Sequence, residues 1–134
     1  MGEPQVTSQL ANFNPAITFD GVDDRVTIPY SSSLNTPSFT LSTVVSANQV
    51  NNGANIFNSL NLNAAPLTGY AIEIFRQDWR FVVADGSTLS QVGGRVITPN
   101  KWFLLTAKLG GILQIFMWMV LYLGHYQYLH FNKI

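Results

Sequence analysis

Three aspartates close together in the sequence are the residues best suited to bind a metal ion. Asp20, Asp23 and Asp24 surround Gly21, and carboxylate oxygens gathered in this way are the hard ligands that calcium prefers. The same pattern also builds an ordinary turn, because an Asp side chain accepts hydrogen bonds from backbone amides a few positions further on. Turn chemistry is therefore the favoured interpretation, and Asp20, Asp23 and Asp24 are the calcium candidates that the sequence offers beside it.

Hydrolytic chemistry would need a pair of carboxylates, and the sequence does not place two together. Glycoside hydrolysis uses two acids that flank the scissile bond, as acids two positions apart on one strand would do. Glu73 has no second acid beside it in its apolar run, and Asp78 follows only after a turn. We therefore predict that the chain is not an enzyme and that Glu73 is an exposed strand residue.

The two histidines, His125 and His130, lie near the C-terminus. Histidine is the usual acid-base group of enzymes and a common metal ligand. A zinc site needs a third ligand, however, and no cysteine is present to supply one. We interpret the two histidines as an accidental pair.

Aromatic and arginine side chains are the candidates for ligand binding. Trp79 and Tyr70 could stack on sugar rings, because an aromatic face offers an oriented apolar surface. Trp79 stands beside a polar turn, whereas Trp102 lies in an apolar run and is expected in the core. Three dispersed arginines could contact an anionic glycan without forming a patch: Arg76, Arg80 and Arg95. The predicted ligand-binding residues are Trp79, Tyr70 and Arg80.

Composition limits the classes of function. The 134 residues suffice for one domain with a two-layer core, and seven basic residues balance seven acidic ones. This balance gives no basic surface for nucleic acid. The absence of cysteine excludes disulfides and thiolate zinc sites. The segment from Met1 to Asn14 has neither the basic nor the apolar region of a signal peptide.

Short β-type runs separated by turn residues predict the elements that must position these side chains. Asp20-Gly21 indicates a hairpin between the first two runs, and Gly93-Gly94 is expected to end a weak strand. Turn signals recur about every ten residues without helical periodicity, which predicts an all-β antiparallel β-sandwich. The expected strands are Ala16–Phe19, Arg25–Ile28, Phe39–Val45, Ala54–Leu60, Tyr70–Phe75, Trp79–Ala84, Leu89–Val92, Val96–Ile97, Trp102–Leu109 and Leu113–Phe116.

Motifs in order along the chain resemble a known family. They are Phe19-Asp20-Gly21 with Asp23-Asp24, Val26-Thr27-Ile28-Pro29, Ser33 to Leu41, Gly69 to Ile72, Trp79-Arg80-Phe81 and Thr98 to Phe103. Together they resemble laminin-G-like domains of the bacterial cell-surface type, over roughly residues 16–116. Thr43-Val44-Val45 and Leu104-Leu105 depart from the family, which usually has Glu and Trp at the first place and often His at the second.

The resemblance implies a concanavalin A-like jelly roll that binds carbohydrate or protein as an adhesion module, with calcium as the candidate cofactor. It places the chain outside the cell or on its surface, within a larger protein. The partners it implies are a glycan or an extracellular protein. Two other hypotheses remain: a degraded glycoside hydrolase-like domain, or a truncated product without a ligand.

The resemblance ends at Phe116. The family continues with a Tyr-Val-Asp-Gly hairpin, whereas this chain reads Met117-Trp118-Met119-Val120. The codons of those four residues, read one base earlier, encode Tyr or His followed by Val-Asp-Gly. We therefore predict an N-terminal lead-in over 1–15, an incomplete jelly-roll domain over 16–116 and an out-of-frame tail over 117–134.

Two other interpretations of the apolar tail remain, an ordinary core strand pair and a membrane anchor. The run from Ile112 to Leu123 is short of the about 20 apolar residues that span a membrane, so no membrane span is predicted. If the terminal strands of the family are missing, an unpaired strand edge remains. An open edge predicts self-association and marginal stability.

Overall fold

The computed structural model describes residues 5–7, 16–34, 36–63, 65–110, 114–123 and 126–133. Contacts along the chain divide it into two compact units, Met1–Leu34 and Asn35–Ile134. Each unit is described by itself.

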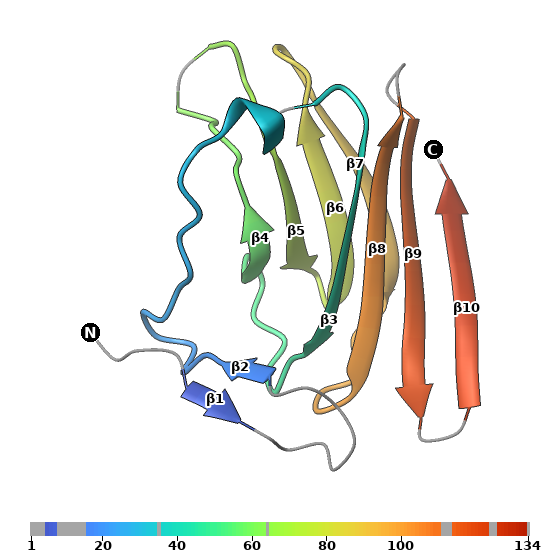
Figure 1. Ribbon diagram of the computed structural model, residues 1–134. Helices are drawn as coiled ribbons and strands as arrows, with labels where there is room; N and C mark the ends of the chain where they lie inside the picture. Colours follow the sequence, from blue (N-terminus) through green and yellow to red (C-terminus); the bar gives the residue numbers. More distant parts are fainter. Residues whose placement is uncertain are drawn as a thin grey trace. The chain divides into compact units, whose positions relative to one another are not determined.

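The larger unit consists of two four-stranded antiparallel sheets (Figure 1). Its strands are β3 Phe39–Ser46, β4 Asn55–Asn58, β5 Tyr70–Phe75, β6 Asp78–Ala84, β7 Leu89–Val96, β8 Trp102–Gly110, β9 Gln114–Leu123 and β10 Tyr126–Lys133. One sheet has the order β10-β9-β8-β3 and the other the order β4-β5-β6-β7. The all-β, antiparallel architecture confirms this part of the predicted fold class.

The core of the larger unit lies between these two sheets. Ile72 of β5 and Phe81 of β6 cluster with Phe103 and Leu105 of β8, and all four side chains are fully buried. Every second residue of β5, β6 and β8 contributes, because successive side chains of a strand point to opposite faces. Apolar packing between two sheets is consistent with a β-sandwich.

The hairpin of β5 and β6 follows directly from its sequence. Alternating apolar residues enter the core from both strands, and Arg76 and Gln77 form the two-residue turn with φ angles of 50° and 76°. Positive φ at both central positions is the type I′ arrangement, whose twist suits a right-handed hairpin. The predicted hairpin is confirmed, and its β6 strand begins one residue earlier, at Asp78.

The prediction that Gly93-Gly94 ends a strand is wrong. β7 runs through both glycines from Leu89 to Val96 and pairs with β6, with a register shift opposite Asp78 and Arg80. Glycine weakens a strand only modestly, and the ladder hydrogen bonds to β6 outweigh that cost here. Of the separately predicted run Val96–Ile97, Val96 is the last residue of this strand and Ile97 lies beyond it.

The smaller unit also differs from its prediction. β2, Ala16–Thr18, pairs with β1, Gln5–Thr7, and a short 3₁₀ turn covers Ser32–Leu34. No strand forms over Arg25–Ile28, so the predicted Asp20-Gly21 hairpin is wrong. The physical reason is that the side chains of the aspartate cluster bind the local backbone amides, as described below.

The C-terminal strands extend the sheet of β8. β9 pairs with β8 from Gln114 to Tyr122, and β10 pairs with β9. The prediction that residues 117–134 are translated out of frame concerns the gene and stays a prediction. No helix in the described part of the chain is long and apolar enough to cross a membrane.

Candidate functional site

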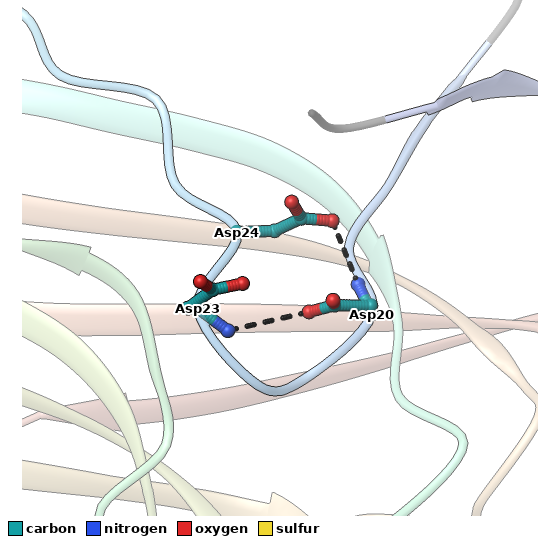
Figure 2. Close-up of side chains that lie close together, drawn as sticks. All are labelled: Asp20, Asp23 and Asp24. Atoms are coloured by element: carbon teal, nitrogen blue, oxygen red, sulfur yellow. Dashed lines mark hydrogen bonds between the residues drawn. The ribbon is translucent and has the colours of Figure 1, made fainter. Parts of the chain in front are cut away.

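The aspartate cluster forms a loop that is held by its own side chains (Figure 2). Asp20 Oδ1 accepts hydrogen bonds from the backbone N–H of Val22 at 2.8 Å and of Asp23 at 3.3 Å. Asp24 Oδ2 accepts one from the N–H of Asp20 at 3.0 Å. These bonds confirm the turn role expected for Asp20, and they satisfy amides that a hairpin ladder would otherwise use.

The same loop also brings carboxylate oxygens together. One oxygen each from Asp20, Asp23 and Asp24 lies within 4.8 Å of the others, a spacing that a cation could bridge. Asp24 is half-buried, and its Oδ1 has no hydrogen-bond partner among the described residues. The sequence-predicted calcium candidates are therefore adjacent in space.

Hydrogen bonding also affects the ionisation of this loop. The N–H of Val22 is the main group that lowers the pKa of Asp20 below its ordinary value of 3.8, and the N–H of Asp23 adds to it, because both favour the charged form. The Asp20 carboxyl is fully exposed. It is therefore negatively charged throughout the neutral pH range.

A second cluster lies on the outward face of the β4–β7 sheet, and we call it the Arg80 patch: Glu73, Phe75, Arg80 and Gln91. Core residues alternate with these positions on β5 and β6, so the side chains of the patch point away from the core. Glu73 and Arg80 are directly opposite each other in the β5–β6 ladder. The patch thus arises from three neighbouring strands.

Arg80 is held from several sides. Its Nε donates to Glu73 Oε1 at 2.8 Å, and its Nη2 donates to the same oxygen. Nη1 donates to Gln91 Oε1 at 2.7 Å. The guanidinium carbon lies 3.7 Å from the centroid of the Phe75 ring, which adds a cation–π contact. This combination fixes the guanidinium plane on the sheet surface.

The partners of Arg80 retain unused hydrogen-bonding capacity. Glu73 Oε2 is an acceptor and Gln91 Nε2 a donor, and neither has a partner among the described residues. Gly93 stands opposite Arg80 on β7, and a Cβ built there would meet no heavy atom within 4 Å. Ala71 and Val82 on the same face are buried, whereas Gln91 and Gly93 are exposed.

Several sequence predictions about single residues need correction. Trp79 is fully buried, at 5.9 Å from the ring of Phe103, so its face cannot stack on a sugar. Trp102, expected in the core, is only half-buried. Trp79 follows the core-facing parity of β6, which decides its burial despite the polar turn beside it.

Tyr70 and Glu73 also differ from their simplest expectations. The Tyr70 ring is half-buried, with the ring of Phe39 at 4.3 Å and that of Phe57 at 5.2 Å, so it already packs against two other rings. Glu73 was expected to be exposed, but its side chain is 14% exposed and ion-paired with Arg80. The hairpin register around the Arg76–Gln77 turn was the sequence signal that could have revealed this pair.

The remaining sequence candidates lie outside the side chains that the structure describes. His125 falls between β9 and β10, and His130 lies within β10. Arg95 lies within β7. The interpretation of the two histidines as an accidental pair, and the anionic-glycan hypothesis for Arg95, therefore stay predictions.

No protein-family model, no curated protein and no solved structure matches this chain. The laminin-G-like resemblance therefore stays a prediction based on the sequence motifs.

Proposed function

We propose that this chain is a non-catalytic carbohydrate-binding module with a laminin-G-like jelly-roll fold, part of a larger extracellular or cell-surface protein. The Arg80 patch is its ligand surface. The observation that carries the proposal is the fixed guanidinium of Arg80, flanked by the free acceptor Glu73 Oε2 and the free donor Gln91 Nε2.

This arrangement suits a sugar because adjacent hydroxyl groups can donate and accept at the same time. One hydroxyl would donate to Glu73 Oε2 and its neighbour would accept from Gln91 Nε2. The groups are already oriented by Arg80, so binding would order few side chains. The open space over Gly93 gives a sugar ring room to approach the sheet.

The same contacts favour binding over hydrolysis. A glycoside hydrolase needs two carboxylates about 5–10 Å apart on either side of the scissile bond. Glu73 instead accepts two hydrogen bonds from Arg80 on one of its oxygens. The Glu73 carboxylate therefore acts as a partner of Arg80 in this proposal, and the degraded-hydrolase alternative requires another pair of acids.

A glycan array on the intact chain tests the proposal. The best glycan is then titrated by calorimetry against Gly93→Leu, which fills the open space, and Thr98→Leu, a matched change at an exposed position outside the patch. We expect Gly93→Leu to lose about tenfold or more in affinity through steric exclusion. Thr98→Leu should bind like the unmodified chain.

A further variant separates charge from geometry. Arg80→Lys keeps the positive charge but cannot bridge Glu73 and Gln91 with a planar fork, so affinity should fall here as well. Thermal melting of each variant shows whether the fold is intact. Unchanged binding by a folded Gly93→Leu variant would contradict the proposed surface, and the truncated-product hypothesis predicts no binding to any glycan.

Calcium is proposed as a cofactor of the aspartate loop, where the unpartnered Asp24 Oδ1 supports it. Asp23→Asn removes one charge without removing a described hydrogen bond of the loop, whereas Asp20→Asn would disturb the turn itself. Calorimetric titration with calcium should show binding that Asp23→Asn weakens. No heat of binding with the unmodified chain would contradict the calcium proposal and leave the Arg80 patch untouched.

A further inference from the structure

β3 has the least protected sheet edge among the edge strands whose side chains the structure describes. β3 is the terminal strand of its sheet and has only β8 as a described neighbour. Natural proteins protect such edges with charges, prolines, bulges or short strands, because unpaired backbone groups otherwise recruit another strand. The larger unit has four edge strands. The side chains of β10 lie outside those that the structure describes, and the other three, β3, β4 and β7, differ in these features.

Two of these edges carry protection. β4 has four residues and a register shift against β5 between Asn55 and Phe57. β7 contains Arg95 and two adjacent glycines, and its pairing with β6 shifts register. Irregular register and low β-propensity at these edges both disfavour regular addition of a further strand.

β3 has none of this protection. Its eight residues, Phe39 to Ser46, contain no charge, proline or glycine, and they pair with β8 in continuous register. The outward-facing Ser42 and Val44 are exposed, Val44 by 56%. The strand is therefore long, regular and uncharged along its whole length.

The core-facing side of β3 is also incompletely covered. Phe39, Leu41 and Val45 pack against the core but are only half-buried, whereas Phe103 and Leu105 on the adjacent strand β8 are fully buried. An additional strand beside β3 would cover these apolar side chains. Both the backbone and the core-facing side chains of β3 thus favour a further neighbour.

We propose that the neighbour is β3 of a second copy of this chain, paired antiparallel across a two-fold axis. The two sheets would then continue into each other, and the interface would be the same patch on both copies, as closed dimers require. A second copy suits this edge because β3 carries no charge, so two identical strands meet without repulsion.

The alternation of β3 restricts the register. Directly opposed residues must lie on the same face, so core-facing positions have to oppose core-facing positions. An axis through Ser42 meets this condition: it places Phe39 opposite Val45 of the second copy and Leu41 opposite Thr43. An axis through Thr43 also meets it but leaves Phe39 beyond the end of the ladder, so we assign the axis to Ser42.

Cysteine cross-linking tests the register directly, because the chain contains no cysteine. Ser42→Cys places two thiols opposite each other across the axis, at a Cα separation that a disulfide accepts. Thr106→Cys is the matched control, since Thr106 is the β8 partner of Ser42 and its hydroxyl lies 3.0 Å from that of Ser42. We expect oxidation to give a covalent dimer with Ser42→Cys and none with Thr106→Cys.

Sedimentation at several concentrations tests the dimer itself. One strand pair buries less than the about 1,200–2,000 Å² of a stable interface, so we expect a concentration-dependent equilibrium. Ser42→Lys opposes like charges at the axis and should raise the dissociation constant about fivefold or more. Thr106→Lys, with the same charge one strand further in, should leave the constant unchanged, and melting curves show that both variants fold.

Four results with the unmodified chain or the single variants would overturn the proposal. They are a monomer at every concentration, equal cross-linking of Ser42→Cys and Thr106→Cys, a dimer insensitive to Ser42→Lys, and open-ended oligomers. An intrachain disulfide in the double variant Ile28→Cys/Ser42→Cys would also overturn it, because the chain's own exposed segment would then occupy the edge. None of these results bears on glycan binding at the Arg80 patch.

Discussion

The β5–β6 hairpin and the loop from Asp20 to Asp24 are two turns that hold their shape in different ways. The hairpin turn, Arg76 and Gln77, has unfavourable positive φ at both positions and is maintained by the packed strands on either side. The aspartate loop lies on exposed chain and is maintained by hydrogen bonds from its own side chains. Packing therefore dictates the first turn and local polar chemistry the second.

The difference explains where ligands are expected. β5 and β6 each have a hydrogen-bonded neighbour along both edges and pack against the core on one face. Their outward side chains are therefore held in a fixed arrangement, as the Arg80 patch shows. The loop instead gathers carboxylate oxygens on a short segment held by its own hydrogen bonds. A rigid surface suits a ligand of defined shape, and a cluster of carboxylate oxygens suits calcium.

Phe81→Ala should give the largest effect, because it removes part of the packing that maintains the β5–β6 hairpin. Phe81 is fully buried, so removing its ring leaves a cavity and should lower the free energy of unfolding by about 3–5 kcal/mol. Urea unfolding followed by fluorescence measures the change. Val22→Ala in the aspartate loop is the control, because Val22 is 86% exposed and should change little. Equal losses for both variants would contradict the distinction.

Glu73→Gln tests the outward face of the same hairpin. The Glu73 and Arg80 side chains are 14% and 20% exposed, so removing one charge should lower the free energy of unfolding by about 1–2 kcal/mol, between exposed and buried ion pairs. Urea unfolding again measures it. Asp23→Asn, the matched charge removal on exposed chain, should not destabilise the β-sheets. A neutral Glu73→Gln would show that the pair does not stabilise the patch.

Gln77→Gly should make the chain more stable, by about 0.5–1 kcal/mol, since glycine adopts the φ of 76° without strain. Thermal melting detects the increase. The opposite change in the other turn, Gly21→Ala, introduces a side chain at a φ of 79° and should speed hydrogen exchange at Val22. A Gln77→Gly variant with a lower melting temperature would show that the Gln77 side chain itself stabilises the turn.

The smallest expected effect is the pH dependence of two exposed turns. Hydrogen bonds from Val22 to Asp20, and from Thr88 to Asp85, lower the pKa of each carboxyl below 3.8. A lowered pKa in the folded chain means that the stabilisation is complete above the unfolded pKa and is lost as pH falls through the folded pKa. NMR titration should therefore show the amides of Val22 and Thr88 shifting below pH 3.8. Midpoints above 3.8 would be contrary to this.

Sequence patterns predicted the larger unit better than the smaller one. The expected strands at Phe39, Tyr70, Trp79 and Trp102 all form, because alternation and turn residues agree with the packing that both sheets supply. The expected strand at Arg25–Ile28 does not form, although its alternation is similar. Alternation alone does not make a strand, since a strand also needs a neighbour to pair with.

The two candidate sites, the aspartate cluster and the Arg80 patch, also differ in how far the sequence predicted them. The aspartate cluster was visible in the sequence because its members are neighbours along the chain and its chemistry is local. The Arg80 patch was visible only through Arg80, since Gln91 and Glu73 join it by strand pairing. For Trp79 the polar turn beside it suggests exposure, but its parity on β6 places it in the core and buries it.

The sequence by itself determined the all-β class, the hairpin with its turn and the oxygen-rich aspartate loop, because each depends on periodicity or on residues close together along the chain. Tertiary structure decided which aromatic residues are buried, which polar side chains meet across β5, β6 and β7, and which strand is left at an edge. These outcomes depend on the order and register of the strands, and hydrogen bonds between distant segments set both.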